Sequence, residues 1–215
     1  MKSSNPEIRI QYSPVLDLFF QQLFKYKQEE DPDLAGVVYD SPEIISEKIK
    51  EFEKVWESKK DVLEYMQQIL GLNFYQTLID VYVVGFSQPT AISTPVIISS
   101  QNIPEVFVKI LIHEILHRLI SDNTQKISAG KILGELYSKE TVLCRNHIVL
   151  HAVLEKIYLE FFKDPQALSK TVEKNKAFPD YARAWEIVEQ QGADEIINNF
   201  KNLYGKQKRM VASSL

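Results

Sequence analysis

The chain has 215 residues, of which 45% are hydrophobic and 25% are charged. This balance is typical of a globular protein and excludes a disordered or fibrous one, and the length allows a sizeable core within one domain. The formal net charge of −4 argues against a nucleic-acid partner, because phosphate binding calls for a basic face.

The sequence also predicts a cytoplasmic protein without a membrane segment. Cys144 is the single cysteine, so no internal disulfide can form, and the N-terminal residues lack the apolar core of a secretion signal. Residues 81–104 carry no charge and are numerous enough to span a bilayer. Three prolines and many polar residues interrupt this stretch, however, and favour two strands joined by a loop.

The first 70 residues predict one strand and three helices. Residues 7–11 alternate polar and apolar side chains, as a short strand does. Ser-Pro pairs then begin helices at residues 14 and 42, since proline is favoured in the first turn. The first of these helices extends to about residue 28. A third helix covers residues 61–70 and ends at Gly71.

The middle of the chain predicts two strands followed by a helix. Residues 78–86 (LIDVYVVGF) and 94–100 (TPVIISS) are rich in β-branched and aromatic side chains, and residues 87–93 form the loop between them. A helix begins at Ile103-Pro104 and ends near residues 121–123.

The remaining residues predict mainly helices. Residues 124–137 are ambiguous between loop and short helix, and a long helix covers residues 139–162 before Asp164-Pro165. Further helices cover residues 180–190 and 193–203. Together these elements predict an α+β fold that is mostly helical and has a small mixed sheet.

The motif with the clearest chemistry is His113-Glu114-Ile115-Leu116-His117. Residues four apart share one helix face, so both imidazoles can bind the same zinc ion. Glu114 would lie beside the open coordination position, where it could take a proton from the zinc-activated water. Two histidines packed by chance beside an unrelated glutamate are the competing interpretation.

A three-ligand zinc site needs one more donor. The chain has four histidines, and the remaining two, His147 and His151, are again four residues apart. Glu140, Cys144, His147 and His151 lie within about 60° of one another on a helix. We expect His147 to be the third ligand and His151 to support it or to stabilise the transition state. His151, Glu140 and Cys144 remain alternative ligands.

These residues resemble the zincin metallopeptidases over about residues 78–162. The chain departs from the metzincin branch, because Ile120 and Asn123 stand where that branch has glycine and histidine. Residues 146–151 are similar in layout to the gluzincin branch, with histidines in place of its two acids. The resemblance implies a single zincin-like domain over residues 1–215, whose small sheet packs on the motif helix. Residues 1–70 would form an N-terminal part, residues 78–162 the catalytic core and residues 165–215 C-terminal helices.

The same resemblance implies that the strand at residues 95–100 forms the rim of the cleft. Its free edge would then pair with an extended peptide, as in strand addition.

The function predicted from these features is a zinc-dependent peptidase that acts on peptides or proteins, with Glu114 as general base. The alternative is a non-catalytic protein whose four histidines hold a structural or regulatory metal, although this leaves Glu114 without a role. A third interpretation is a di-iron bundle, because Glu114-x-x-His117 matches half of such a site. That architecture needs a second Glu-x-x-His sequence, which the chain lacks.

Overall fold

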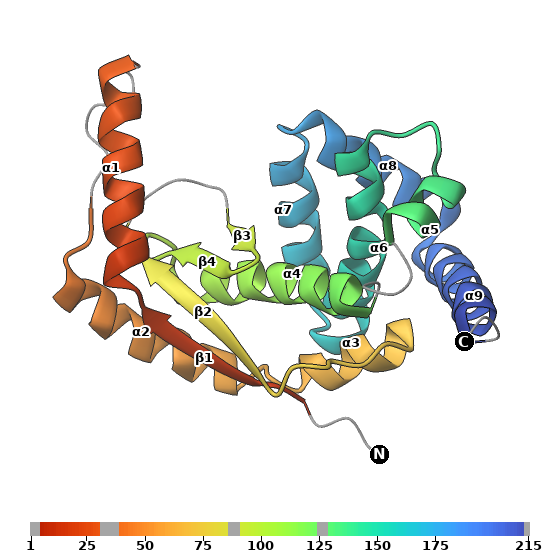
Figure 1. Ribbon diagram of the computed structural model, residues 1–215, viewed down its shortest axis with the longest axis horizontal. Coiled ribbons are helices and arrows are strands. Elements are labelled where there is room, and N and C mark those ends of the chain that lie inside the picture. The colour runs from red at the N-terminus through yellow and green to blue at the C-terminus, as the bar shows by residue number, and fades with distance from the viewer. Residues whose placement is uncertain (1–4, 31–38, 86–90, 124–128, 213–215) are drawn as a thin grey trace. The chain divides into compact units, whose positions relative to one another are not determined.

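A computed structural model describes residues 5–30, 39–85, 91–123 and 129–212. It confirms the predicted α+β class, mostly helical with a small mixed sheet (Figure 1). The described residues form two compact units, here called the sheet unit (residues 5–60 and 76–118) and the helical unit (residues 61–75 and 119–212). The chain passes between the two units after residues 60, 75 and 118, and the last of these passages lies within helix α4.

The sheet unit contains β1 (Glu7–Tyr12), α1 (Pro14–Glu30), α2 (Pro42–Glu57), β2 (Leu78–Val84), β3 (Ile92–Ser93), β4 (Val96–Ser99) and the part of α4 (Pro104–Asn123) up to residue 118. The strand order is β1-β2-β4-β3. Strands β1, β2 and β4 are parallel to one another, and β3 is antiparallel to β4. The strands predicted at residues 7–11, 78–86 and 94–100 are confirmed as β1, β2 and β4, with boundaries shifted by a few residues.

The edge strand β3 was not predicted, because its two residues lie in the segment expected to be a loop. Ile92 pairs with Ile97 and Ser93 pairs with Val96. The expected free edge of β4 is therefore wrong at Val96 and Ile97, since β3 occupies it. A strand of two residues is too short to show the alternation on which sequence-based strand prediction depends.

Side chains of β2 alternate between the two faces of the sheet, as they do in any strand. Val84, with Ile97 of β4, forms one cluster with Leu16 and Phe20 of α1. The opposite face carries Val81 and Val83 of β2, both fully buried. Helix α2 runs alongside β1 and β2 (Figure 1).

A ring contact fixes the helix that carries the histidine motif inside the sheet unit. Phe52 of α2 stacks on Phe107 of α4, with ring centroids 3.9 Å apart, and both side chains are fully buried. Leu111 and Ile115 of α4 are also fully buried. The motif helix is thus held by apolar packing, which contributes most to the stability of a helix in a protein.

A tightly packed glycine follows β2. Gly85 donates its N–H to Asp17 Oδ1 at 2.7 Å, and a Cβ built on Gly85 would lie 2.7 Å from the carbonyl oxygen of Asp40. We expect Gly85→Ala to lower the free energy of unfolding by about 2 kcal/mol through this overpacking. Chemical denaturation measures the change. The matched control Gly205→Ala, in an open helical position with no neighbour closer than 4.0 Å, should instead stabilise by about 0.5–1 kcal/mol; equal effects of the two changes would contradict the prediction.

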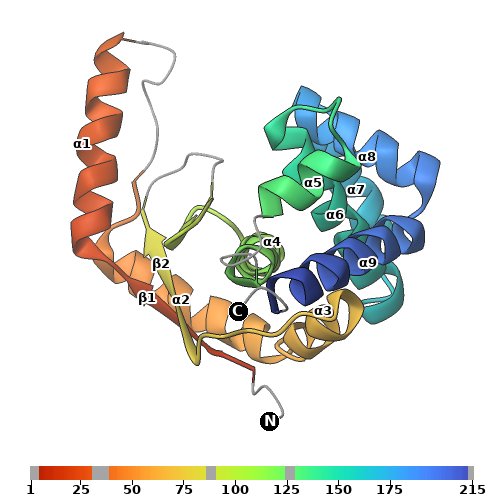
Figure 2. The ribbon, with the colours of Figure 1, turned by 45° about the vertical axis from the view of Figure 1, so that its right-hand side comes forward.

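The helical unit contains α3 (Val62–Leu70), α5 (Ala129–Leu136), α6 (Val142–Lys156), the π-helical continuation η2 (Ile157–Phe161), α7 (Pro165–Asn175), α8 (Pro179–Gln191) and α9 (Ala193–Ala212). Both α8 and α9 pack against α6 (Figure 2). Helix α6 begins at the Thr141 cap, two residues later than expected, and α7 was not predicted. Within the described residues, none of the helices combines the length and the apolar character needed to cross a bilayer.

Candidate metal centre

His113 and His117 occupy adjacent turns on one face of α4, within the sheet unit. Their Nε2 atoms lie 3.2 Å apart, and both rings are partly exposed. Two imidazole nitrogens on one tetrahedral zinc are about 3.4 Å apart, given Zn–N bonds of about 2.05 Å. The separation of this pair is close to the one that a shared metal ion requires, and it is also the length of a hydrogen bond between two imidazoles.

Glu114 is buried on the same helix, with 6% of its surface exposed. Ser93 of β3 donates a hydrogen bond from its Oγ to Glu114 Oε2 at 2.5 Å. Burial raises the pKa of Glu114 to about 7, against the opposing effect of the Ser93 hydrogen bond. A cation held by the flanking histidines would favour the ionised carboxylate and lower this pKa. Sequence reasoning missed Ser93, because no motif links it to Glu114, which lies 21 residues further along the chain.

His147 lies on α6, within the helical unit. The helix begins where the Thr141 side chain accepts a hydrogen bond from the amide of Cys144. His147 is 3% exposed, and its Nδ1 lies 2.8 Å from the carbonyl oxygen of Leu143. Because a carbonyl can only accept, Nδ1 carries the proton and Nε2 carries the lone pair that can bind a metal. Burial also lowers the pKa of His147, which favours this neutral form.

Aromatic rings from α8 surround the two histidines of α6. The ring of Tyr181 lies 4.1 Å from that of His147, and the ring of Trp185 stacks on that of His151 at 4.2 Å. His151 is fully buried, and its ring centroid is 5.5 Å from that of His147. The rings of Tyr181 and Trp185 restrict how the two imidazoles can turn. Sequence reasoning did not identify this packing, since it depends on how α6 and α8 meet.

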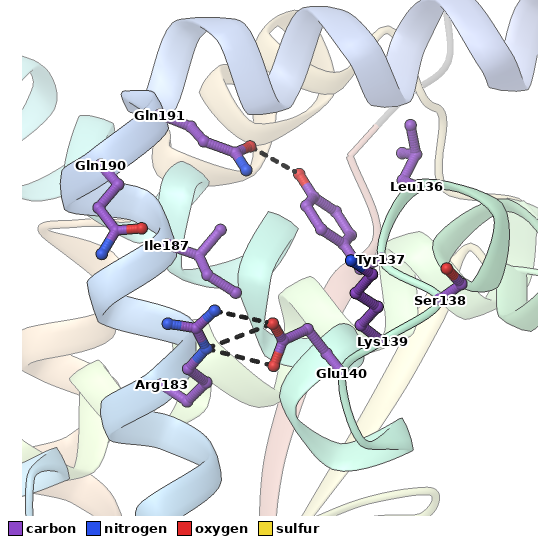
Figure 3. Close-up of a pocket in the computed structure, with 9 residues that line it drawn as sticks. All are labelled: Leu136, Tyr137, Ser138, Lys139, Glu140, Arg183, Ile187, Gln190 and Gln191. Atoms are coloured by element: carbon purple, nitrogen blue, oxygen red, sulfur yellow. Dashed lines mark hydrogen bonds and ion pairs between the residues drawn. The ribbon is translucent and has the colours of Figure 1, made fainter.

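Glu140 lies before the first residue of α6 and forms an ion pair with α8. Arg183 donates from Nη2 to Glu140 Oε1 at 2.9 Å and from Nε to both carboxylate oxygens at 3.3 Å. These bonds hold the pKa of Glu140 below its usual value. Figure 3 shows the pair among the residues that line a pocket of about 260 Å³, where Tyr137 also donates a hydrogen bond to Gln191. The carboxylate proposed as an alternative ligand is thus engaged by a guanidinium.

Cys144 is buried, and its Sγ lies 3.8 Å from Glu140 Oε2. Burial and the nearby carboxylate raise the pKa of the thiol to about 11. Because the thiolate is the reactive form, we expect alkylation by iodoacetamide at pH 8 to be at least ~100-fold slower in the folded chain than in the unfolded chain. Mass spectrometry of the alkylated protein measures both rates; rapid labelling of the folded chain would contradict the burial of this residue.

The predicted site residues therefore form two groups. The sheet unit brings His113, Glu114 and His117 together on α4, and the helical unit brings His147 and His151 together on α6. Each group is a pair of imidazoles one helical turn apart. The first pair has a buried carboxylate between its members, and the second is enclosed by aromatic rings.

Comparisons with known proteins add no assignment: no family model, curated protein or solved structure matches the chain.

Proposed function

We propose that the chain is a zinc-dependent metallopeptidase in which His113, His117 and His147 hold the metal and Glu114 is the general base. The observation that carries the proposal is the pair of Nε2 atoms 3.2 Å apart on α4, with a buried carboxylate on the residue that follows the first histidine. A structural metal site needs no such carboxylate, whereas hydrolysis by an activated water does.

The choice of His147 as third ligand rests on its protonation state and its neighbours. Its Nδ1 donates to the Leu143 carbonyl, an arrangement that orients metal-bound histidines and leaves Nε2 to bind the ion. The ring of His151 stacks on that of Trp185 and lies 5.5 Å from that of His147. This position suits a residue that supports the proposed ligand His147. Glu140 is the weaker candidate, because binding zinc would require it to leave Arg183.

In the proposed reaction the metal and Glu114 have different roles. Zinc, when bound, supplies a Lewis acid that acidifies a water molecule and polarises the peptide carbonyl. Glu114 accepts the proton of the attacking water and delivers it to the amine that leaves. His113, His117 and His147 would hold the ion as three protein ligands, the number that is typical of catalytic zinc sites.

The proposal is tested with the full-length chain, loaded with zinc and incubated with a randomised pool of quenched fluorescent octapeptides. We expect about one zinc per chain, cleavage of a subset of the peptides, loss of cleavage on treatment with 1,10-phenanthroline and recovery when zinc is returned. Zinc bound without any cleavage of this pool or of denatured protein would contradict the enzymatic proposal and favour the structural or regulatory metal site. Absence of zinc would contradict both.

A further inference from the structure

Two consecutive residues attach the β3–β4 hairpin to the motif helix. Ser93 donates to Glu114 Oε2 at 2.5 Å, and Thr94 Oγ1 accepts from Arg118 Nη1 at 2.9 Å. Glu114 and Arg118 are four residues apart, so they lie on one face of α4, one turn from each other. All four residues belong to the sheet unit.

The strand pairing holds the backbone that carries the Ser93 side chain. Ser93 pairs with Val96 and Ile92 pairs with Ile97, so the backbone of β3 is held by β4 independently of the hydroxyl. A serine hydroxyl has one proton to donate, and here it is directed to a single carboxylate oxygen. The 2.5 Å distance is that of a direct hydrogen bond between a hydroxyl and a carboxyl oxygen.

A hydrogen-bond donor is needed to orient the carboxylate of Glu114 if it is to act as a general base. Apolar packing limits where this buried side chain lies, but its terminal torsion is broad, so the carboxylate plane keeps rotational freedom unless a directional contact fixes it. A general base must meet the proton that it removes within hydrogen-bond distance, and small errors of placement cost rate. A hydroxyl on Oε2 removes most of this freedom, and it leaves the second oxygen for the proton.

We propose that Ser93 is a positioning residue for Glu114: it holds Oε2 so that Oε1 faces the water whose proton is taken. This inference rests on the proposed function, because it assigns a role within the same reaction. It adds a residue from the edge strand of the sheet to the residues proposed to take part in the reaction. Ser93 acts through Glu114 and needs no contact with the substrate.

The role of Ser93 is tested with Ser93→Ala, Ser93→Thr and the neighbouring control Thr94→Val, using the best-cleaved peptide of the octapeptide pool. We expect Ser93→Ala to lower kcat about tenfold, with KM within about twofold of wild type and zinc content unchanged. Ser93→Thr keeps the hydroxyl and should restore most of kcat. Thr94→Val loses the Arg118 contact but leaves the Glu114 bond, so its kcat should stay within about twofold of wild type.

Two results would overturn the inference while leaving the peptidase proposal intact. One is a Ser93→Ala enzyme with wild-type kcat, and the other is a Ser93→Thr enzyme as slow as Ser93→Ala. A purely structural role for Ser93 would lower the unfolding temperature but would not change kcat of the folded enzyme.

Failure of the peptidase proposal can be distinguished from failure of the Ser93 role, because in the first case the wild-type protein would bind zinc and cleave nothing. In that case, crystal structures of zinc-loaded wild type and Ser93→Ala test whether Ser93 orients the Glu114 carboxylate. We expect one carboxylate orientation of Glu114 in the wild type and several in the variant. The same single orientation in both would overturn it.

Discussion

Glu114→Gln is expected to lower kcat by about 10²–10⁴-fold, the usual contribution of a general base, while zinc stays bound. The amide has the shape of the carboxylate and can still accept the Ser93 hydrogen bond, but it cannot take a proton from water. The two histidines of α4 that are proposed to bind the metal are unchanged. Steady-state hydrolysis of the best-cleaved peptide and metal analysis of the same sample measure the two quantities.

Glu105→Gln is the matched control, because Glu105 is an exposed carboxylate on the same helix. Its kcat and zinc content should equal those of wild type. If Glu114→Gln hydrolysed the peptide as fast as Glu105→Gln, Glu114 would not be the base. If Glu114→Gln lost its zinc, the lower rate would have a different cause, and the assigned role would again be wrong.

His147→Ala is expected to weaken zinc binding by more than ~100-fold, since it would remove one of the three proposed direct ligands. His151→Ala should weaken it only by about 10–100-fold, the effect typical of residues that orient a ligand. Glu140→Ala should leave zinc affinity unchanged, because the Glu140 carboxylate is bound to Arg183. Competition with a zinc-binding dye of known affinity measures all three variants.

Circular dichroism must accompany this series, because His147 and His151 are both buried and their removal leaves space in the packing around α8. His147→Gln, which retains a polar side chain of similar length, separates lost packing from a lost ligand: it should fold and still bind zinc weakly. The ligand assignment would be contradicted if His151→Ala or Glu140→Ala lost more affinity than His147→Ala.

Most helices of this chain could be predicted because their ends are marked locally. Proline at the first turn begins α1, α2 and α4, and Gly71 ends α3 in a left-handed conformation with φ of 63°. Helix α7 has the same signal, with proline at residue 165 and an aspartate cap, but its weak apolar pattern concealed it. Strand β3 carries no local signal, because it forms only through pairing with β4.

In the candidate site, too, features that depend on local spacing could be predicted, and contacts between elements could not. The spacing of His113 and His117 predicts a shared helix face, and the 3.2 Å separation of their Nε2 atoms agrees with it. The hydrogen bond from Ser93 to Glu114 and the stacking of Trp185 on His151 depend on tertiary packing. Single-sequence patterns describe one helix or strand at a time, so contacts between elements lie beyond them.

Anomalous diffraction from crystals of the zinc-loaded full-length chain, recorded at the zinc absorption edge, tests the central claim most directly. We expect one zinc peak about 2.1 Å from the Nε2 atoms of His113, His117 and His147, with the fourth position left to solvent. A peak without His147 among its ligands, a site closed by His151 as a fourth protein ligand, or no peak at α4 would contradict it.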